Sequence, residues 1–383
     1  MVNKGGDSEG KKGRKRKIRK NIGGSPYIGK LSRGCELCLE GAKLVLLVTG
    51  LCDSKCYYCP LSDRRKSKDV IYANERSIIG DEELLKEGQI SDAEGAGITG
   101  GEPFMVFERT LHYIKLLKQE FGQNFHIHLY TTGKMATKEK LERLHKAELD
   151  EIRFHPVGRD SLERLGDALE YDWKVGVEAP AIPQGGEKLI RIASYLEEVE
   201  AHFFNINELE ISETNFKELD EKGFRLKEGT FAAVEGSEET ALKVLDWCRE
   251  NVRKLSVHYC PTWIKDGVQL RNRLLRRAKN VARPYQEITE EGLLYFGIIE
   301  PISSGGDLKE EERAQFEGIV RILRKRFEVP IEMLRVNPKK GRVETAWYIV
   351  EEIAPHLKRK GLKCATVEEY PTKDRLQTLY LPL

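Results

Sequence analysis

The sequence predicts an α/β fold: a partial or complete (β/α) barrel followed by a smaller α/β domain at the C-terminal end. Segments typical of buried parallel strands alternate with helical segments between residues 43 and 259. A second, shorter alternation of strand and helix begins at residue 292. The 383 residues, 40% of them hydrophobic and 33% charged, suffice for a large core and a second domain, and they exclude a disordered chain.

The strands of the larger domain are predicted from short apolar runs, as in residues 43–48, Lys-Leu-Val-Leu-Leu-Val. The helices between them place apolar residues on one face, for example Leu111, Ile114 and Leu117. Strands are expected at 43–48, 95–102, 125–129, 151–154, 174–177, 203–211 and 255–259, and helices at 81–87, 108–119, 138–147, from 161, 188–199 and 238–250. Repeated units of this kind imply a parallel sheet with helices outside it.

Three domains are expected along the chain. Residues 1–22 are predicted to be a disordered basic tail, residues 23–290 the barrel domain, and residues 291–383 a small α/β domain. The basic segment 271–279 is expected to be a linker helix. The last domain is expected to contain strands at 293–299, 331–336 and 363–369 and helices at 307–327 and 343–358.

The positive charge of the chain is concentrated at its beginning. The first 33 residues carry eleven Lys and Arg against two Asp and Glu, a net charge of +9 in a chain whose total is +2. No apolar stretch follows this charge, so it is not a secretion signal, and no apolar run approaches the ~20 residues of a membrane span. A basic tail can contact phosphates, which makes RNA a candidate partner; the alternative is a solvated extension.

Five of the eight cysteines lie between residues 35 and 59. This crowding indicates metal ligation in a reducing cytoplasm rather than a disulfide scaffold. Cys52, Cys56 and Cys59 follow the first predicted strand, at the carboxyl end where α/β folds place their sites. Their thiolates suit zinc or an iron–sulfur cluster, and a trio of ligands leaves one metal position open for a ligand from outside the protein.

The spacing C-x3-C-x2-C, with Tyr58 before the last cysteine, resembles the signature of radical S-adenosylmethionine (SAM) enzymes. Three further segments match this family in order: Thr99-Gly100-Gly101-Glu102-Pro103, Thr131-Thr132-Gly133 and Val175-Gly-Val-Glu178. The resemblance covers roughly residues 34–270 and is nearest to an archaeal group related to the pyruvate formate-lyase activating enzyme. It implies a fold of the radical SAM type.

The resemblance also implies the cofactors. Cys52, Cys56 and Cys59 would hold three irons of a [4Fe–4S] cluster, and the fourth iron would bind SAM. SAM would lie at Tyr58, Gly100, Gly101 and Glu102, with Thr131, Thr132, Gly133 and Glu178 lining its site. An electron donor such as a ferredoxin or a flavodoxin is the expected partner, and no residue is expected to act as a general base.

The remaining cysteines leave three interpretations open. Cys35 and Cys38 form a C-x2-C segment between glycines, which Cys260 and Cys364 could complete as a second metal site. The site would hold an auxiliary iron–sulfur cluster or structural zinc, and the third interpretation is ordinary buried thiols. Polar side chains at Asn207, Glu208, Glu210 and His155 are candidates for the substrate cavity, whereas His258 is expected to be a core histidine.

The sequence predicts a radical SAM enzyme that generates a 5′-deoxyadenosyl radical and acts on an unidentified substrate. An alternative within the same class is the modification of RNA, which the basic tail suggests. A different class is a zinc-stabilised RNA-binding protein without catalysis.

Overall fold

The computed structural model of the protein describes residues 15–158, 160–301 and 310–383. The chain forms two compact units. The first comprises Met1–Leu39, Val45–Ile71 and Gly95–Asp266, and the second Glu40–Leu44, Tyr72–Glu94 and Gly267–Leu383. This division differs from the expected boundary at residue 290, because the basic helix α10 (Arg271–Val281), expected to be a linker, lies within the second unit.

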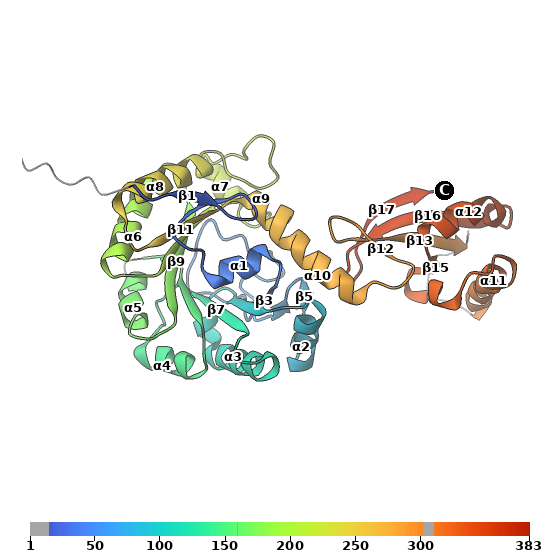
Figure 1. Cartoon of the computed structure of the whole chain (residues 1–383), viewed down its shortest axis with the longest axis horizontal. Coiled ribbons are helices and arrows are strands. Elements are labelled where there is room, and N and C mark those ends of the chain that lie inside the picture. Colours follow the sequence, from blue (N-terminus) through green and yellow to red (C-terminus); the bar gives the residue numbers. More distant parts are fainter. Residues whose placement is uncertain (1–14, 159, 302–309) are drawn as a thin grey trace, which may run out of the picture. The chain divides into compact units, whose positions relative to one another are not determined.

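The first unit is built on a curved sheet of parallel strands, shown in Figure 1. Its strands are β3 (Lys43–Leu47), β6 (Gly95–Thr99), β7 (His126–Thr131), β8 (Glu151–Phe154), β9 (Lys174–Ala181), β10 (Phe203–Glu208) and β11 (Ser256–Cys260). The neighbours from β6 to β11 pair in parallel and in chain order, and β3 follows beside β6. The order is open, so the sheet is a partial barrel.

Helices cover the outer face of this sheet (Figure 1). They are α3 (Phe107–Phe121), α4 (Lys138–Lys146), α5 (Asp160–Ala168), α6 (Gly186–Glu198) and α8 (Ser237–Asn251). Because side chains alternate along a strand, one set faces these helices and forms the core; Ile127, Leu129 and Val177 are fully buried members of it. The short helix α1 (Arg33–Leu39) packs against β6 and β7 and lies within the curve of the sheet (Figure 1).

The expected disorder of residues 1–22 is wrong for its second part. Strand β1 (Ile18–Lys20) pairs antiparallel with β2 (Pro26–Ile28), which in turn pairs with β11. The backbone N–H of Arg16 also donates to the carbonyl oxygen of Arg249. Backbone hydrogen bonds at a sheet edge order a segment without requiring an apolar pattern, which is why the composition gave no sign of it. Residues 1–14 lie outside the described residues.

The second unit contains an antiparallel sheet in the order β14-β15-β13-β16-β17. These strands are β13 (Leu294–Pro301), β14 (Arg335–Asn337), β15 (Arg342–Thr345), β16 (Leu362–Glu369) and β17 (Gln377–Pro382), and β12 (Glu287–Ile288) pairs with β13. Helices α11 (Glu310–Arg326) and α12 (Trp347–Lys358) accompany them, and α2 (Asp81–Ile90) with the hairpin of β4 (Tyr72–Ala73) and β5 (Arg76–Ser77) belongs to the same unit.

Two expectations for this unit are wrong. The predicted helix 343–358 begins only at Trp347, because Arg342–Thr345 is strand β15. The predicted strand 331–336 is a 3-10 turn, Ile331–Met333, followed by β14. The first residues of the predicted helix 307–327 lie outside the described residues. None of the helices in the described parts of the chain is long and apolar enough to span a membrane.

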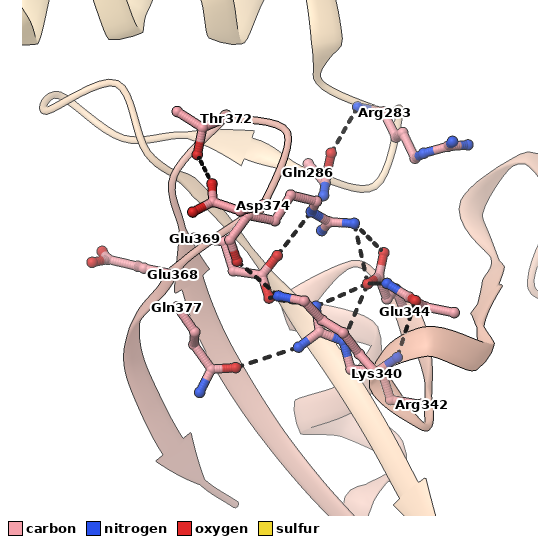
Figure 2. Close-up of polar contacts among 12 residues, drawn as sticks. Arg283, Gln286, Lys340, Arg342, Glu344, Glu368, Glu369, Thr372, Asp374 and Gln377 are labelled. Carbon is pink, nitrogen blue, oxygen red and sulfur yellow. Dashed lines mark hydrogen bonds and ion pairs between the residues drawn. The ribbon is translucent and has the colours of Figure 1, made fainter. Parts of the chain in front are cut away.

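A network of buried charges joins the strands of the second unit (Figure 2). The Arg342 guanidinium contacts the carboxylates of Glu344 at 2.9 Å and Glu369 at 2.5 Å. Lys340 and Arg375 also contact these carboxylates, and neither Glu344 nor Glu369 has exposed surface. Burial alone would raise the pKa of Glu344, but Arg375 and its other donors lower it to about 2.

Candidate functional site

The three cysteines of the C-x3-C-x2-C motif lie in the loop that follows β3, at the carboxyl end of the parallel sheet. Cys52 is exposed, and Cys56 and Cys59 are half-buried. The N–H of Cys59 donates to the carbonyl oxygen of Cys56 at 3.1 Å, which closes a tight turn between these two cysteines. Burial raises the pKa of Cys52 and Cys56, so metal binding at this loop would release protons.

No three His, Cys, Asp or Glu side chains, among the residues the structure describes, lie so as to hold a single metal ion. In an iron–sulfur cluster each thiolate binds a different iron, so its ligands surround a larger body than one ion. Three thiols in one loop, with a half-exposed face, fit such a cluster.

The glycine turn after β6 packs directly against the cysteine loop. The N–H of Gly101 donates to the carbonyl oxygen of Thr49, and the N–H of Glu102 donates to that of Leu51, both at 2.8 Å. A Cβ added at Gly101 would lie 2.1 Å from the Leu51 oxygen and 2.9 Å from Cys52 Cβ. A Cβ at Gly100 would lie 2.4 Å from the Thr49 oxygen. Only glycine permits this approach, so the turn and the loop form one cradle.

Glu102 links the glycine turn to the end of β7. Its buried carboxylate accepts hydrogen bonds from the N–H of Phe104, from the Thr131 hydroxyl, and from both the N–H and the hydroxyl of Thr132. Four donors occupy the acceptor positions of a carboxylate, so an ammonium group from a ligand must displace one of them. The predicted contact with SAM stays a prediction.

The Thr131-Thr132-Gly133 segment forms the turn at the end of β7. Thr131 and Thr132 are buried on Glu102, and the Thr131 hydroxyl oxygen also accepts from the N–H of Gly133. Gly133 has a φ of +84°, which L side chains rarely adopt. The structure therefore brings this segment together with the glycine turn, and its expected place in the SAM site stays a prediction.

Tyr58 is held by His155 at the end of β8. The Tyr58 hydroxyl lies 3.0 Å from His155 Nε2, and His155 Nδ1 lies 3.0 Å from the carbonyl oxygen of Glu178. A carbonyl oxygen only accepts, so Nδ1 carries the proton and Nε2 accepts from Tyr58. Burial lowers the pKa of His155 and raises that of Tyr58, which keeps both groups neutral.

The segment after β10 also contacts the cysteine loop. Nothing in the sequence indicated this contact. The side-chain amide of Asn215 donates to the carbonyl oxygen of Tyr58 at 3.2 Å, and the Thr214 hydroxyl donates to that of Cys59 at 3.4 Å. The Lys222 ammonium lies 4.7 Å from the centroid of the Tyr57 ring. No spacing in the sequence connects residues 57–59 with residues 214–222, so only the fold reveals this contact.

The inner face of the sheet carries a polar network centred on Arg153. Its guanidinium, almost fully buried, contacts the Glu151 carboxylate at 2.5 Å and the Glu178 carboxylate at 3.0 Å. Glu178 also accepts from the Tyr130 hydroxyl and the side-chain amides of Asn205 and Asn207. The carboxylate of Glu178, expected to line the SAM site, therefore already has hydrogen-bond partners within the protein, and its contact with SAM stays a prediction.

The sequence signal for this network was the period-2 alternation of polar residues along the strands. Glu151 and Arg153 are two residues apart on β8, and Asn205 and Asn207 on β10. Asn207 was a candidate and faces this network. Glu208 instead faces outward, where its carboxylate accepts from the N–H and hydroxyl of Thr262.

One further candidate, Glu210, and the expected core histidine His258 lie on or after the neighbouring strands. Glu210, after β10, forms an ion pair of 2.5 Å with Lys265. His258, expected to be a core histidine, is buried on β11, with its Nε2 3.0 Å from the Ser25 hydroxyl.

The Cys35–Cys38 segment is one turn of helix α1 and not a loop knuckle. Cys35 is buried beside Arg153 and Asn205, and Cys38 is half-exposed. Cys260 ends β11 in the same unit, and burial raises its pKa to about 12. Cys364 lies on β16, in an apolar core of the second unit with Ile299, Leu357 and others. Metal binding at these cysteines stays a prediction.

Comparison with known proteins identifies two matching families. The radical SAM superfamily matches residues 46–161, and a domain of unknown function, DUF8061, matches residues 292–383. A protein of Methanocaldococcus jannaschii named "Putative glycyl-radical enzyme activating enzyme" is 42% identical over 369 residues, which cover 92% of this chain and 93% of that protein. The name of this relative gives no support for the RNA partner expected from the basic tail.

Two similar solved structures have SAM bound. Streptococcus suis SuiB bound to S-adenosylmethionine has a TM-score of 0.41 and 14% identity, covering 57% of this chain and 50% of SuiB. The protein anSMEcpe with bound AdoMet has a TM-score of 0.38 and 15% identity, covering 56% of this chain and 60% of anSMEcpe. The chain thus spans about half of these proteins. The long match to the M. jannaschii relative and the match at residues 46–161 show that the chain belongs to the radical SAM superfamily and is an enzyme.

Proposed function

We propose that the enzyme binds a [4Fe–4S] cluster through Cys52, Cys56 and Cys59 and uses it to cleave SAM reductively. When bound, the cluster supplies the electron that breaks a sulfonium C–S bond of SAM, which gives a 5′-deoxyadenosyl radical able to take a hydrogen atom from a substrate. The observation that best supports the proposal is the cradle between Gly101 and the cysteine loop, which leaves no room for a Cβ.

The protein's own residues bind and orient. Gly100 and Gly101 allow the backbone to approach SAM, and Glu102 accepts from its ammonium group after releasing one internal donor. Thr131, Thr132 and Gly133 fix the position of Glu102, and Glu178 reaches the ribose. Tyr58, whose hydroxyl is held by His155, keeps the loop ordered between its second and third cysteine.

The substrate class is proposed from the M. jannaschii relative. Its name describes the activation of a glycyl-radical enzyme. By this likeness, the substrate of the present enzyme is a glycine residue in a partner protein, from which a hydrogen atom is removed. The reaction consumes one electron for each SAM, so a small one-electron carrier such as a ferredoxin or flavodoxin is the second partner.

Anaerobic reconstitution with iron and sulfide, followed by reduction with dithionite, tests the cleavage. The wild-type protein should release 5′-deoxyadenosine and methionine from SAM, and Cys56→Ala should lower this release at least 100-fold, because two thiolates do not hold the cluster with an open iron. Cys248→Ala, which removes a buried thiol of α8, is the matched control and should retain cleavage. Undiminished cleavage by Cys56→Ala would refute the proposal.

Electron paramagnetic resonance tests the substrate class separately. Mixing the reduced enzyme and SAM with a purified glycyl-radical enzyme from the same source should produce a protein-based organic radical. Cleavage of SAM without such a radical in any candidate partner would contradict the protein substrate while leaving the cofactor chemistry intact.

A further inference from the structure

The Cys35–Cys38 pair has no part in the proposed cleavage of SAM. The sequence allows three interpretations of this pair: ligands of an auxiliary iron–sulfur cluster, ligands of structural zinc, or free thiols. In the structure the two cysteines lie one helical turn apart on α1. Cys364, a candidate ligand, is only 3% exposed in the apolar core of the second unit, and the described residues provide no set of three donors for a single metal ion such as zinc. Cys35 and Cys38 by themselves are two thiols one helical turn apart.

The sulfur of Cys35 is surrounded by N–H donors. Arg153 Nη2 lies 3.6 Å and Asn205 Nδ2 3.3 Å from Cys35 Sγ, both within hydrogen-bond range for sulfur. A cation and an amide that donate to one sulfur favour its thiolate form. Burial by itself raises the pKa of Cys35, but Arg153 and His258 outweigh it and lower this pKa to about 7.

Three other cysteines, of which Cys248 and Cys364 are buried and Cys260 is half-buried, have the opposite environment. Burial raises the pKa of Cys248 and of Cys260 to about 12, and that of Cys364 to about 11. These three remain protonated at neutral pH and are inert. Among the buried cysteines, Cys35 is the one whose surrounding hydrogen-bond donors favour the thiolate form. Cys38, one helical turn further along α1, is half-exposed.

We propose that Cys35 and Cys38 form a redox-active dithiol that exchanges with small disulfides. The accessible Cys38 thiol loses a proton to water and attacks one sulfur of the disulfide, which forms a mixed disulfide and releases the first thiolate. The Cys35 thiolate then attacks the Cys38 sulfur, which closes the Cys35–Cys38 bond and releases the second thiolate. Two electrons pass from the two protein sulfurs to the reagent, and the two released thiolates take up from water the protons that the Cys35 and Cys38 thiols have given up, so the reagent is reduced to two thiols.

The helix allows this closure with a small adjustment. Residues three apart on a helix have Cβ atoms roughly 5–6 Å apart, and a disulfide needs roughly 3.5–4.5 Å. The required approach is thus about 1–2 Å. Helix α1 is seven residues long and begins two residues before Cys35, so a change in its first turn disturbs few backbone hydrogen bonds.

Oxidation would also change the network on the inner face of the sheet. A disulfide sulfur accepts hydrogen bonds more weakly than a thiolate, so Arg153 and Asn205 would lose an anionic acceptor. Both side chains also donate to Glu178. Oxidation of Cys35 and Cys38 would therefore change the hydrogen bonds around Glu178, the carboxylate proposed to reach the ribose of SAM.

Exchange with oxidised glutathione tests the proposal on the full chain, purified without oxygen. Trypsin releases residues 34–43 as one peptide that contains Cys35 and Cys38 and no other cysteine. After incubation, alkylation and digestion, mass spectrometry should find this peptide lower by two hydrogens. The thiols of Cys248 and Cys364 should remain reduced.

Two single variants test the order of attack. Cys35→Ser should leave a stable glutathione adduct on Cys38, because the resolving thiolate is missing. Cys38→Ser should leave Cys35 unmodified, because that sulfur is buried. An adduct on Cys35 in the second variant, or none on Cys38 in the first, would contradict the proposed roles.

Arg153→Met tests the cause of the reactivity. If the pKa of Cys35 returned from about 7 toward the ordinary 9.0, its thiolate fraction at pH 7 would fall about 50-fold. Higher nucleophilicity offsets part of this loss, so the mixed disulfide should close about fivefold more slowly. Arg143→Met, which removes an exposed arginine of α4, is the matched control and should close at the wild-type rate.

The exchange of the wild-type protein with oxidised glutathione tests the proposed dithiol even if Arg153→Met fails to fold. A peptide 34–43 that resists both glutathione and alkylation until a chelator is added would show metal thiolates and overturn the proposal. Two thiols that react only after denaturation, at the rate of Cys248, would show an inert pair and overturn it as well.

Discussion

Both units of the molecule bury an arginine between two carboxylates, and both do so with residues two apart on one strand. In the first unit Arg153 contacts Glu151 of the same strand and Glu178 of the next. In the second unit Arg342 contacts Glu344 of the same strand and Glu369 of β16 (Figure 2). The two networks differ in the groups that complete them.

The second network is completed by further charges. Lys340 and Arg375 bring it to three cations and two carboxylates, and Tyr285 and Asn337 donate to Glu344. The first network is completed by neutral or reactive groups: the Tyr130 hydroxyl, two asparagine amides and the Cys35 sulfur. The Arg342 network consists mainly of ion pairs and stabilises the second unit. The Arg153 network of the first unit also contains groups that can change their hydrogen-bond partners.

The largest expected effect is the loss of the central arginine of the saturated network. Arg342→Met leaves Glu344 and Glu369 buried with fewer counter-charges, which should lower the free energy of unfolding of the second unit by about 3–5 kcal/mol. Urea unfolding measures this change. SAM cleavage by the folded fraction should stay at the wild-type rate. A loss below about 1 kcal/mol would show that Lys340 and Arg375 compensate.

Acid should destabilise the two units at different pH values. The pKa of Glu344 is lowered to about 2 in the folded protein. Its contribution to the free energy of unfolding of the second unit is therefore complete above about pH 4.5 and is lost as the pH falls toward 2. Because a tenfold change in acid dissociation corresponds to about 1.4 kcal/mol, the loss is on the order of 3 kcal/mol.

In the first unit, acid should act earlier. Burial lowers the pKa of His155 and His202, so the folded state holds them neutral and loses stability as the pH falls below about 6.5. Hydrogen exchange followed by mass spectrometry at pH 7, 5 and 3.5 should show residues of the first unit opening first. Earlier opening of residues 335–369 would contradict this order.

A smaller effect is expected for Glu102. Glu102→Gln replaces one carboxylate oxygen by an amide of the same size, which should weaken SAM binding by roughly 1.5–3 kcal/mol, or about 10–100-fold in Kd, without loss of the cluster. Equilibrium binding of SAM to the reconstituted protein measures the change. Glu108→Gln, an exposed glutamate of α3 paired with Arg143, is the control and should bind SAM as the wild type does.

The smallest effect is expected for an exposed ion pair, which serves as the reference for the buried networks. Arg143→Met breaks the exposed ion pair with Glu108 and should leave the midpoint of thermal unfolding unchanged within error, because water solvates both charges in either state. A clear decrease would mean that exposed pairs of this chain contribute as buried ones do, and the contrast between surface and buried networks would lose its basis.

The sequence predicted the strands of the first unit well because the side chains that face the helices are apolar, in a continuous run in β3 and at every second position in β7 and β8, and because the cysteine and glycine motifs lie at strand ends. It predicted the second unit less well. Strand β15, Arg-Val-Glu-Thr, contains a buried arginine and a buried glutamate, so it has no apolar signature and was assigned to the following helix.

Within the site, the residues near the motifs could be predicted and their partners could not. The three donors from Thr131 and Thr132 to Glu102 join segments 29–30 residues apart, and the contact between Tyr58 and His155 joins segments 97 residues apart. Local periodicity carries no information on such contacts, which depend on strand register. The position of Cys35 beside Arg153 depends on how α1 packs within the sheet and had no signal in the sequence.

The hairpin of β1 and β2 has a consequence for self-association. The open edge of a sheet presents unpaired N–H and C=O groups to other chains, and an exposed edge at β2 would invite a second copy to pair there. Strand β1 pairs with β2 and covers this position with three residues, Ile18-Arg19-Lys20, of which the last two are exposed and positively charged. Two copies meeting along this edge would oppose like charges, and a chain shortened to residue 23 would lose that protection and expose β2 as the new edge.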